Sequence, residues 1–205
     1  ARSLGLKTIS ITDHDAVDSV EEASKFGKTG KPRVDVIAGI ELKVKNEPQR
    51  GIVDVEILGY GIDPKNMTLG AVLDKRRESK IRKTEKQIRL IEKDGYELPI
   101  GEVKDVTKGL VSRRPHMWEV FQRHNACISK RDFFKRTSFG GGWYVEEDYT
   151  LSLEDCIETI KRAGGVAIVA HPGAYNKIFE KRILFDQETI KLLENCVKAG
   201  VQGVE

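Results

Sequence analysis

The sequence predicts an α/β protein, a (β/α)-type barrel interrupted by a mostly helical insertion. Strand and helix patterns alternate in the first third of the chain, helix patterns dominate the middle, and the alternation returns in the last third. Strand–helix–strand units at both ends imply parallel strands joined by right-handed crossovers. We therefore expect the first part of the barrel at 1–67, the helical insertion at 68–150 and the second part of the barrel at 151–205.

The first third contains three candidate strands and one helix. A short run rich in β-branched residues predicts a buried strand at 7–12, and two further strands are expected at 34–42 and 52–62. Between the first two, Ser19 and Glu22 have the spacing of a capping box, which predicts a helix that ends at Gly27. At the start of the chain, residues 1–4 followed by Gly5 are typical of the last turn of a helix.

The middle of the chain opens with a basic helix. Residues 74–93 carry nine Lys or Arg against four Asp or Glu, which favours a solvated helix face over an anion-binding one. Ile81, Ile88 and Ile91 form its narrow apolar stripe. A glycine triplet at 140–142 then predicts a flexible turn before Trp143, whose expected role is core packing rather than stacking on a base.

The last third returns to alternation. A second capping box at Ser152 and Asp155 opens a helix with one apolar face, formed by Leu153, Cys156, Ile157 and Ile160. A continuous apolar run predicts a buried strand at 166–170. Another helix is expected at 187–199, with Ile190, Leu193 and Val197 facing inward.

Composition is that of an ordinary soluble globular protein. Of the 205 residues, 39% are hydrophobic and 33% charged, and no apolar run approaches the ~20 residues needed to cross a bilayer, so no membrane partner is expected. The three cysteines, Cys127, Cys156 and Cys196, have no paired spacing and are interpreted as buried, reduced thiols of a cytoplasmic protein. The net charge of +3 is too small to imply nucleic-acid binding by itself.

Potential metal ligands follow three of the predicted strands. His14, between Asp13 and Asp15, follows the first strand, Glu41 ends the second, and His171 follows the strand at 166–170. Functional groups of parallel α/β folds gather at the carboxyl ends of strands, where imidazole and carboxylate groups can bind Zn, Mn or Fe. Each residue alone also fits a structural role, and the two aspartates can cap the following turn. The coincidence of two of only four histidines at strand ends is what favours a metal site.

The ordered motifs resemble those of the PHP (polymerase and histidinol phosphatase) family. Ile11-Thr12-Asp13-His14-Asp15 is similar to its TDHD motif, Ala38-Gly39-Ile40-Glu41 to a G-[IV]-E strand end, and Ile57-Leu58-Gly59-Tyr60-Gly61 to its ILGYG strand. Ala170-His171-Pro172-Gly173 resembles the AHPG motif, and Arg114-Pro115-His116 resembles an R-P-H segment of the nucleotide-phosphatase and exoribonuclease branch. The resemblance covers nearly the whole chain.

The resemblance implies a distorted (β/α)₇ barrel that holds two or three divalent ions (Mn, Fe or Zn). It implies hydrolysis of phosphate esters of nucleotides or short RNA by metal-activated water. His14 and His171 would be metal ligands and Glu41 a bridging carboxylate, while Asp13 and His116 would be catalytic. Arg114, together with His116, would bind the substrate phosphate, because a guanidinium fork suits phosphate geometry.

The chain departs from the family pattern at three places. The opening H-x-H and the closing D-x-H are absent, which leads us to expect a fragment that lacks several ligands and does not turn over substrate. The strand before Leu58 usually carries a His ligand, and here the position holds Glu56. A carboxylate accepts the same hard ions, so Glu56 is a candidate ligand, although weakened affinity is the preferred interpretation.

Two other functions are weighed against the enzyme. A PHP-like module that has lost catalysis but still binds nucleotides or nucleic acid is favoured by Glu56 and the missing ligands, whereas His14, Glu41, His171 and the R-P-H segment favour the phosphoesterase. A Rossmann-type cofactor binder is disfavoured because no strand is followed by GxGxxG.

Overall fold

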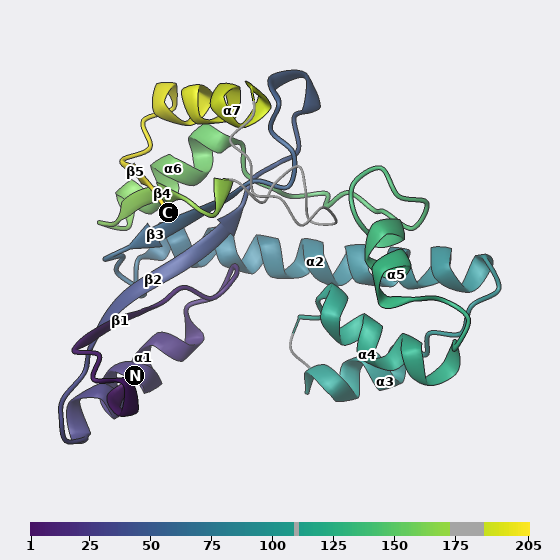
Figure 1. Cartoon of the computed structure of the whole chain (residues 1–205), viewed down its shortest axis with the longest axis horizontal. Coiled ribbons are helices and arrows are strands. Elements are labelled where there is room, and N and C mark those ends of the chain that lie inside the picture. The colour runs from purple at the N-terminus through teal and green to yellow at the C-terminus, as the bar shows by residue number, and fades with distance from the viewer. Residues whose placement is uncertain (109–110, 173–186) are drawn as a thin grey trace. The chain divides into compact units, whose positions relative to one another are not determined.

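The computed structural model describes residues 1–108, 111–172 and 187–205. The protein is a mixed α/β structure that divides into two compact units. The first comprises residues 1–74 and 150–205 and contains the sheet, and the second comprises residues 75–149 and is helical (Figure 1).

The first unit is built on a five-stranded sheet whose strands lie in the order of the sequence. The strands are β1 (Thr8–Ile11), β2 (Asp35–Lys43), β3 (Glu56–Tyr60), β4 (Val166–Val169) and β5 (Gly203–Val204). β1 pairs in parallel with β2, and β4 pairs in parallel with β5. The parallel strands expected at both ends of the sequence are therefore confirmed.

The central strand β3 runs antiparallel to both of its neighbours, β2 and β4. Its connection to β2 contains only a short 3-10 turn, Pro48–Arg50, and no crossover helix. Antiparallel strands can be joined this way, whereas parallel ones need a longer crossover. The register pairs Lys43 with Glu56, so the start of β3 lies at the same sheet edge as the end of β2.

The helices are α1 (Asp18–Thr29), α2 (Met67–Lys93), α3 (Ile100–Thr107), α4 (Arg114–His124), α5 (Lys130–Thr137), α6 (Leu153–Arg162) and α7 (Gln187–Lys198). α1 packs against β1 and β2, and α6 packs against β3 and β4. The start of α6 is as predicted, since Ser152 Oγ accepts a hydrogen bond from the backbone N–H of Asp155. The helix predicted near Ser19 is present as α1, but its predicted cap is wrong: the helix begins at Asp18 and the Ser19 hydroxyl donates instead to the carboxylate of Asp13.

The inward face predicted for α7 is also wrong. Ile190 and Val197 are 43% and 66% exposed, while Thr189, Leu192 and Cys196 are buried. The helix is therefore turned by about one residue, or ~100°, from the expected orientation. α6 behaves as predicted, because its apolar face of Leu153, Cys156, Ile157 and Ile160 is buried.

The helical unit has a core of its own. Nine buried side chains form it: Ile88, Ile91, Leu98, Val103, Met117, Val120, Phe121, Phe133 and Trp143. Trp143 is 1% exposed, which confirms its predicted packing role, and its indole N–H donates to Asp94. Ile81 was expected in the same stripe but is 46% exposed, because it precedes the segment of α2 against which the aromatic residues pack.

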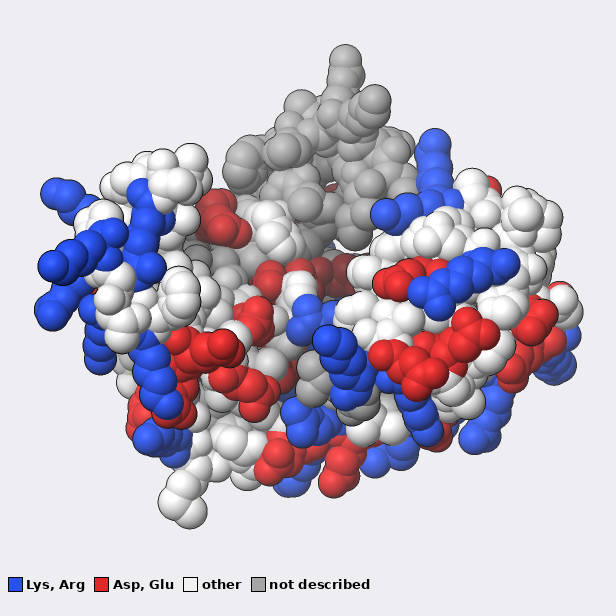
Figure 2. Space-filling model, turned by 90° about the horizontal axis from the view of Figure 1, so that it is seen from below, with Lys and Arg blue, Asp and Glu red and all other residues white. Residues whose placement is uncertain are grey.

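Acidic and basic side chains are interspersed on the face shown in Figure 2. On α2, Arg82 pairs with Asp148 at the surface, as expected of a solvated helix face. Lys83, however, pairs with a Glu147 side chain that is only 4% exposed, and Arg76 is fully buried, so the prediction holds for only part of this helix. None of the helices described is both long and apolar enough to span a membrane. Cys156 and Cys196 are buried as expected, but Cys127 is exposed, because it lies in the connection between α4 and α5.

Candidate metal centre

Four side chains from separate segments meet at one edge of the sheet. Nδ1 of His14 lies 2.8 Å from Oε2 of Glu41 and 3.7 Å from Oε1 of Glu56. Nε2 of His171 lies 3.3 Å from Oε1 of Glu41 and 3.4 Å from Oε2 of Glu56. The two carboxylates thus lie between the two imidazoles. The structure brings together all four residues that the sequence marks as ligands.

Backbone pairing places His14 beside Glu41. The two residues form an isolated parallel bridge just beyond β1, in which the N–H of Glu41 donates to the carbonyl of Asp13 and the N–H of Asp15 donates to the carbonyl of Glu41. Asp15 adopts a positive φ of 50°, a conformation that aspartate tolerates better than most residues. This turn holds the imidazole at the carboxyl end of the strand.

The reversed direction of β3 accounts for the position of Glu56. Because β3 is antiparallel to β2, its first residue lies at the edge where β1, β2 and β4 end. The carbonyl of Glu56 accepts the N–H of Ala170, the residue before His171. His171 leaves the strand with a positive φ of 29°, and this turn directs its ring toward the carboxylates. The final residue of the AHPG motif, Gly173, lies outside the described residues.

The electrostatics of the cluster favour a charged Glu41 beside a protonated His171. Burial alone would raise the pKa of Glu41, but hydrogen bonds from His14 and His171 outweigh it and lower the pKa to about 2. Hydrogen bonds to Glu41 and then Glu56 raise the pKa of His171 to about 10. Without a cation, His171 therefore carries a proton at neutral pH. The positive charge of its imidazolium then compensates the negative charge of Glu41, as a metal ion would.

The donor set fits a divalent transition metal. One ligand atom each from His14, Glu41 and Glu56 lie within 4.8 Å of one another. Ligand atoms bound at ~2.0–2.2 Å to one ion lie about 3–3.5 Å apart in tetrahedral or octahedral geometry, and the separations of 2.8–3.7 Å fall close to this range. Imidazole with carboxylate is a combination suited to Zn, Mn and Fe. The side chains of Glu41 and Glu56 are mostly buried, at 12% and 21% exposed. The imidazoles of His14 and His171 are more accessible to solvent, at 40% and 44% exposed.

Glu205 is a neighbour of the site that the sequence interpretation missed. It follows β5, and its Oε2 accepts the backbone N–H of His171 at 3.3 Å. Burial, followed by the charges of Glu205 and Glu41, raises the pKa of Tyr60. A signal was present, because Glu205 is a carboxylate directly after a strand, which is the same pattern that marked Glu41.

Arg114 and His116 lie in the second unit, at the first turn of α4. Nη1 of Arg114 donates to the hydroxyl of Ser138 at 2.5 Å, and its guanidinium lies over the ring of Phe134. Nδ1 of His116 accepts the N–H of Arg113 at 3.2 Å. A neutral His116 therefore carries its proton on Nε2, which can donate to a phosphate or leaving oxygen. Their approach to the metal centre stays a prediction.

Known proteins similar to this chain are phosphatases and nucleases. No family model matches it. The chain is 27% identical over 201 residues to a 3′,5′-nucleoside bisphosphate phosphatase of Chromobacterium violaceum, a match that covers 96% of this chain and 65% of that protein. It is 26% identical over 176 residues to a 5′-3′ exoribonuclease of Haemophilus influenzae, covering 86% and 62%. The chain thus spans a little less than two thirds of the length of these relatives.

Two solved structures share the fold. One, from Bifidobacterium adolescentis, is described as a metal-dependent phosphoesterase, and it superposes with a TM-score of 0.75 at 24% identity over 100% of this chain and 68% of its own. The other is an amidohydrolase from Chromobacterium violaceum with bound sulfate and no metal, with a TM-score of 0.79 at 25% identity over 99% and 67%.

Proposed function

We propose that this chain belongs to a metal-dependent phosphoesterase of the PHP family that hydrolyses phosphate esters of nucleotides or short RNA. The observation that carries the proposal is the convergence of His14, Glu41, Glu56 and His171 at one sheet edge, where each imidazole nitrogen lies 2.8–3.7 Å from oxygens of both carboxylates. Similarity to a bisphosphate phosphatase and to an exoribonuclease supports the substrate class. Sulfate, bound in one similar structure, is a tetrahedral oxyanion like phosphate.

His14, Glu41, Glu56 and His171 would hold the cation. A bound divalent ion supplies Lewis-acid activation of water and neutralises charge on the phosphoryl group. Glu41 presents one oxygen to each imidazole, so its two oxygens point toward different neighbours. This arrangement suits a carboxylate that bridges two ions, and we include two or three ions and the (β/α)₇ barrel in the proposal.

Residues around the ligands would bind substrate and move protons. Asp13 is exposed at the end of β1, where its carboxylate accepts the Ser19 hydroxyl, and it would orient or deprotonate the attacking water. Arg114 would bind the phosphate as a bidentate fork. His116 would donate a hydrogen bond from its Nε2–H to the leaving oxygen and so stabilise the charge that develops there. The free cysteines agree with a reducing, cytoplasmic location.

The test combines metal analysis with hydrolysis. The chain would be loaded in turn with Mn²⁺, Fe²⁺ and Zn²⁺ and assayed on a nucleoside 3′,5′-bisphosphate and on a 5′-phosphorylated oligoribonucleotide. The absent H-x-H and D-x-H motifs predict no turnover, whereas the assembled cluster of His14, Glu41, Glu56 and His171 predicts release of phosphate or mononucleotide that a chelator and His14→Ala both abolish. His124→Ala is the matched control, because His124 pairs with Glu97 and Glu102 in the helical unit.

Two results would contradict the proposal. Failure to bind any of the three ions would remove the metal centre itself. Stoichiometric metal without hydrolysis of either substrate would favour the alternative function, a nucleotide-binding module that has lost catalysis. Glu56 at a position where histidine is expected is the observation in favour of that alternative.

A further inference from the structure

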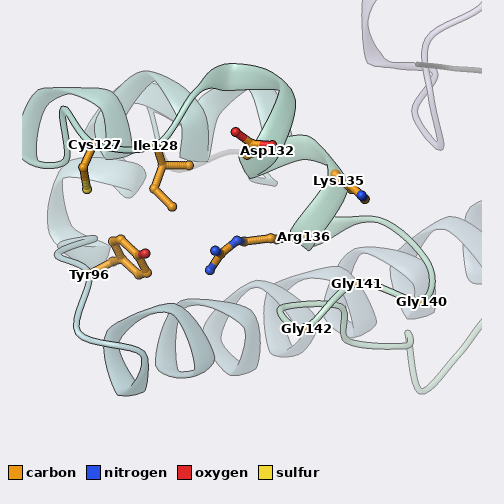
Figure 3. A pocket seen from close by; sticks show the side chains of 9 residues that line it. All are labelled: Tyr96, Cys127, Ile128, Asp132, Lys135, Arg136, Gly140, Gly141 and Gly142. Carbon is orange, nitrogen blue, oxygen red and sulfur yellow. The ribbon is translucent and has the colours of Figure 1, made fainter. Parts of the chain in front are cut away.

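A cavity lies within the helical unit, lined by residues that no step of the proposed hydrolysis uses. Its volume is about 650 Å³, which falls in the range of small-molecule pockets, ~300–1,000 Å³. Residues from three segments line it: the connection after α2 (Tyr96), the connection before α5 together with α5 itself (Cys127, Ile128, Asp132, Lys135 and Arg136), and the glycine turn 140–142. Figure 3 shows the side chains of Tyr96 and Arg136 pointing toward one another across it.

The cavity offers positive charge. Arg136 and Lys135 are exposed and form no ion pair within 1–108, 111–172 and 187–205. The single carboxylate in the lining, that of Asp132, already accepts the hydroxyl of Ser129. Two cations against one carboxylate leave the charged side chains of the lining with a net charge of +1, which favours an anionic ligand.

The cavity also offers flat surfaces for stacking. The guanidinium of Arg136 lies 4.8 Å from the ring centre of Trp143 and 5.9 Å from that of Tyr96. Trp143 is buried and fixed in the core, and Tyr96 is half-buried with its ring packed edge-on against Trp143 at 5.1 Å. The guanidinium is therefore held as a preformed plane beside an aromatic ring. Nucleobases stack on both kinds of surface.

The glycine turn allows backbone to approach the ligand closely. Gly140 has a positive φ of 78°, and a Cβ on Gly141 would lie 2.3 Å from the carbonyl oxygen of Arg136, so both positions need glycine. The N–H of Gly141 is bound to the Ser138 carbonyl, and no hydrogen bond of the Gly140 or Gly142 N–H is found among the described residues. Free N–H groups without side chains around them are suited to phosphate oxygens.

We infer that this cavity is a binding site for one nucleotide of single-stranded RNA. The base stacks against Arg136 and Tyr96, and the phosphate lies toward Lys135 and the glycine turn. The choice of RNA as the ligand rests on the proposed function. The cavity adds a binding site that contains none of the four metal-ligand candidates. A ligand that is only an anion would use the two cations of the cavity. It would not use the flat surface of the stacked guanidinium, which suits a nucleobase.

The test measures RNA binding by fluorescence anisotropy, with a short fluorescein-labelled oligoadenylate and the whole chain in excess EDTA. Lys135→Glu is compared with Arg131→Glu. Both residues are exposed on α5 and both variants change the net charge equally, but only Lys135 lines the cavity. We expect Lys135→Glu and Arg136→Gln each to weaken binding about tenfold or more, with Arg131→Glu within about twofold of the unaltered chain.

Gly142 provides a second, independent variant pair. A Cβ there meets no atom within 4 Å and its φ is not positive, so a side chain at this position projects into open space without strain. We expect Gly142→Glu to abolish binding and Gly142→Lys to preserve or strengthen it. Equal effects of the two would overturn the inference, as would equal effects of Lys135→Glu and Arg131→Glu.

Cys127 reports where the RNA binds. It is the exposed cysteine of the three and lines the cavity, whereas Cys156 and Cys196 are buried. Saturating oligoadenylate is expected to slow alkylation of Cys127 by iodoacetamide, measured by mass spectrometry, and this protection is expected to be lost in Gly142→Glu. Binding without protection of Cys127 would place the RNA elsewhere and overturn the inference.

These measurements separate the two proposals. Because binding is measured in EDTA, it does not depend on the metal centre, and His14→Ala is expected to bind oligoadenylate normally. Hydrolysis together with binding that ignores the cavity variants would refute the cavity and leave the phosphoesterase intact. Binding that depends on the cavity variants, without hydrolysis in the presence of any of the metals, would support the cavity site and refute the phosphoesterase.

Discussion

Nδ1 of His14 lies 2.8 Å from Oε2 of Glu41, and the backbones of the same two residues are joined as a parallel bridge. The side-chain contact is therefore set by the strand pairing rather than by a flexible loop. Any change that shifts β1 relative to β2 should therefore change the site.

Gly39→Ala should damage the metal centre without touching a ligand. A Cβ on Gly39 would lie 2.7 Å from Cγ2 of Thr12 and 2.9 Å from the carbonyl oxygen of Ile11, so β1 and β2 must separate. We expect a loss of about 1–3 kcal/mol in the free energy of unfolding and weaker metal binding. Urea titration and metal competition would measure both. Gly70→Ala is the control: nothing lies within 4 Å, and an alanine inside α2 should stabilise by roughly 0.5–1 kcal/mol.

His171→Ala should remove most of the metal affinity. Second-sphere changes at metal sites already cost about 10–100-fold, so loss of a direct ligand should cost at least as much. Competition with a chromogenic chelator would measure the affinity. His124→Ala serves as the control, since His124 binds Glu102 at 2.9 Å in the helical unit. Equal metal affinity in the two variants would rule out His171 as a ligand.

Glu56→Gln should reveal how Glu56 contributes. Because Glu56 is the second cause of the raised pKa of His171, its neutralisation should move that pKa down from about 10. NMR titration of the imidazole in metal-free protein would show the shift. Glu56→His should restore affinity for Zn²⁺ relative to Glu56→Gln, because imidazole is a good zinc ligand. If Glu56→Gln bound metal as tightly as the original chain, Glu56 would not be a ligand.

The stability of the metal-free protein should depend on pH in two windows. The pKa of Glu41 falls from 4.5 to about 2 in the folded state, so its contribution is complete above 4.5 and is lost as pH falls toward 2. The pKa of His171 rises from 6.5 to about 10, so its contribution is complete below 6.5 and is lost as pH rises toward 10. The free energy of unfolding, measured by urea titration in EDTA, should therefore be highest between pH 4.5 and 6.5. Glu41→Gln should flatten both limbs.

Metal uptake should release a proton for the same reason. His171 must lose its proton before Nε2 can bind an ion, and its pKa of about 10 means that this proton is present at neutral pH. Metal affinity should therefore rise with pH until about 10. Calorimetry in buffers of different ionisation enthalpy would count the protons released. A pH-independent affinity would show that His171 is not a ligand.

His116→Gln should lower the rate of hydrolysis and leave metal binding unchanged. Its Nδ1 accepts the N–H of Arg113, so the proton on Nε2 is oriented by the backbone. Loss of one hydrogen-bond donor to developing negative charge costs about 10²–10³-fold in rate. A matched control is Arg123→Gln on the same helix, where Arg123 pairs with Glu119. A variant that lost metal as well as activity would argue for a structural role.

Much of the fold and the candidate ligands could be predicted from local pattern. Strand ends and their short motifs mark His14, Glu41 and His171, because a buried apolar run followed by polar residues is visible in one dimension. The Ser152 cap and the apolar face of α6 were predicted correctly for the same reason. Such signals depend on neighbours within a few positions.

Tertiary structure decided the features that depend on distant partners. Pattern does not reveal the direction of a strand, so the antiparallel β3 that carries Glu56 to the site appears only once the sheet is assembled. The rotation of α7 is set by what it packs against, since Thr189, Leu192 and Cys196 form an inward face about as well as the expected residues. The Ser19 hydroxyl donates to Asp13 because the turn after β1 brings that carboxylate near. The sequence pattern of a capping box contains no information about this alternative hydrogen-bond acceptor. The cavity around Arg136 is lined by three segments that are separate in the sequence. It forms only because the helical core holds Tyr96 and Trp143 in position.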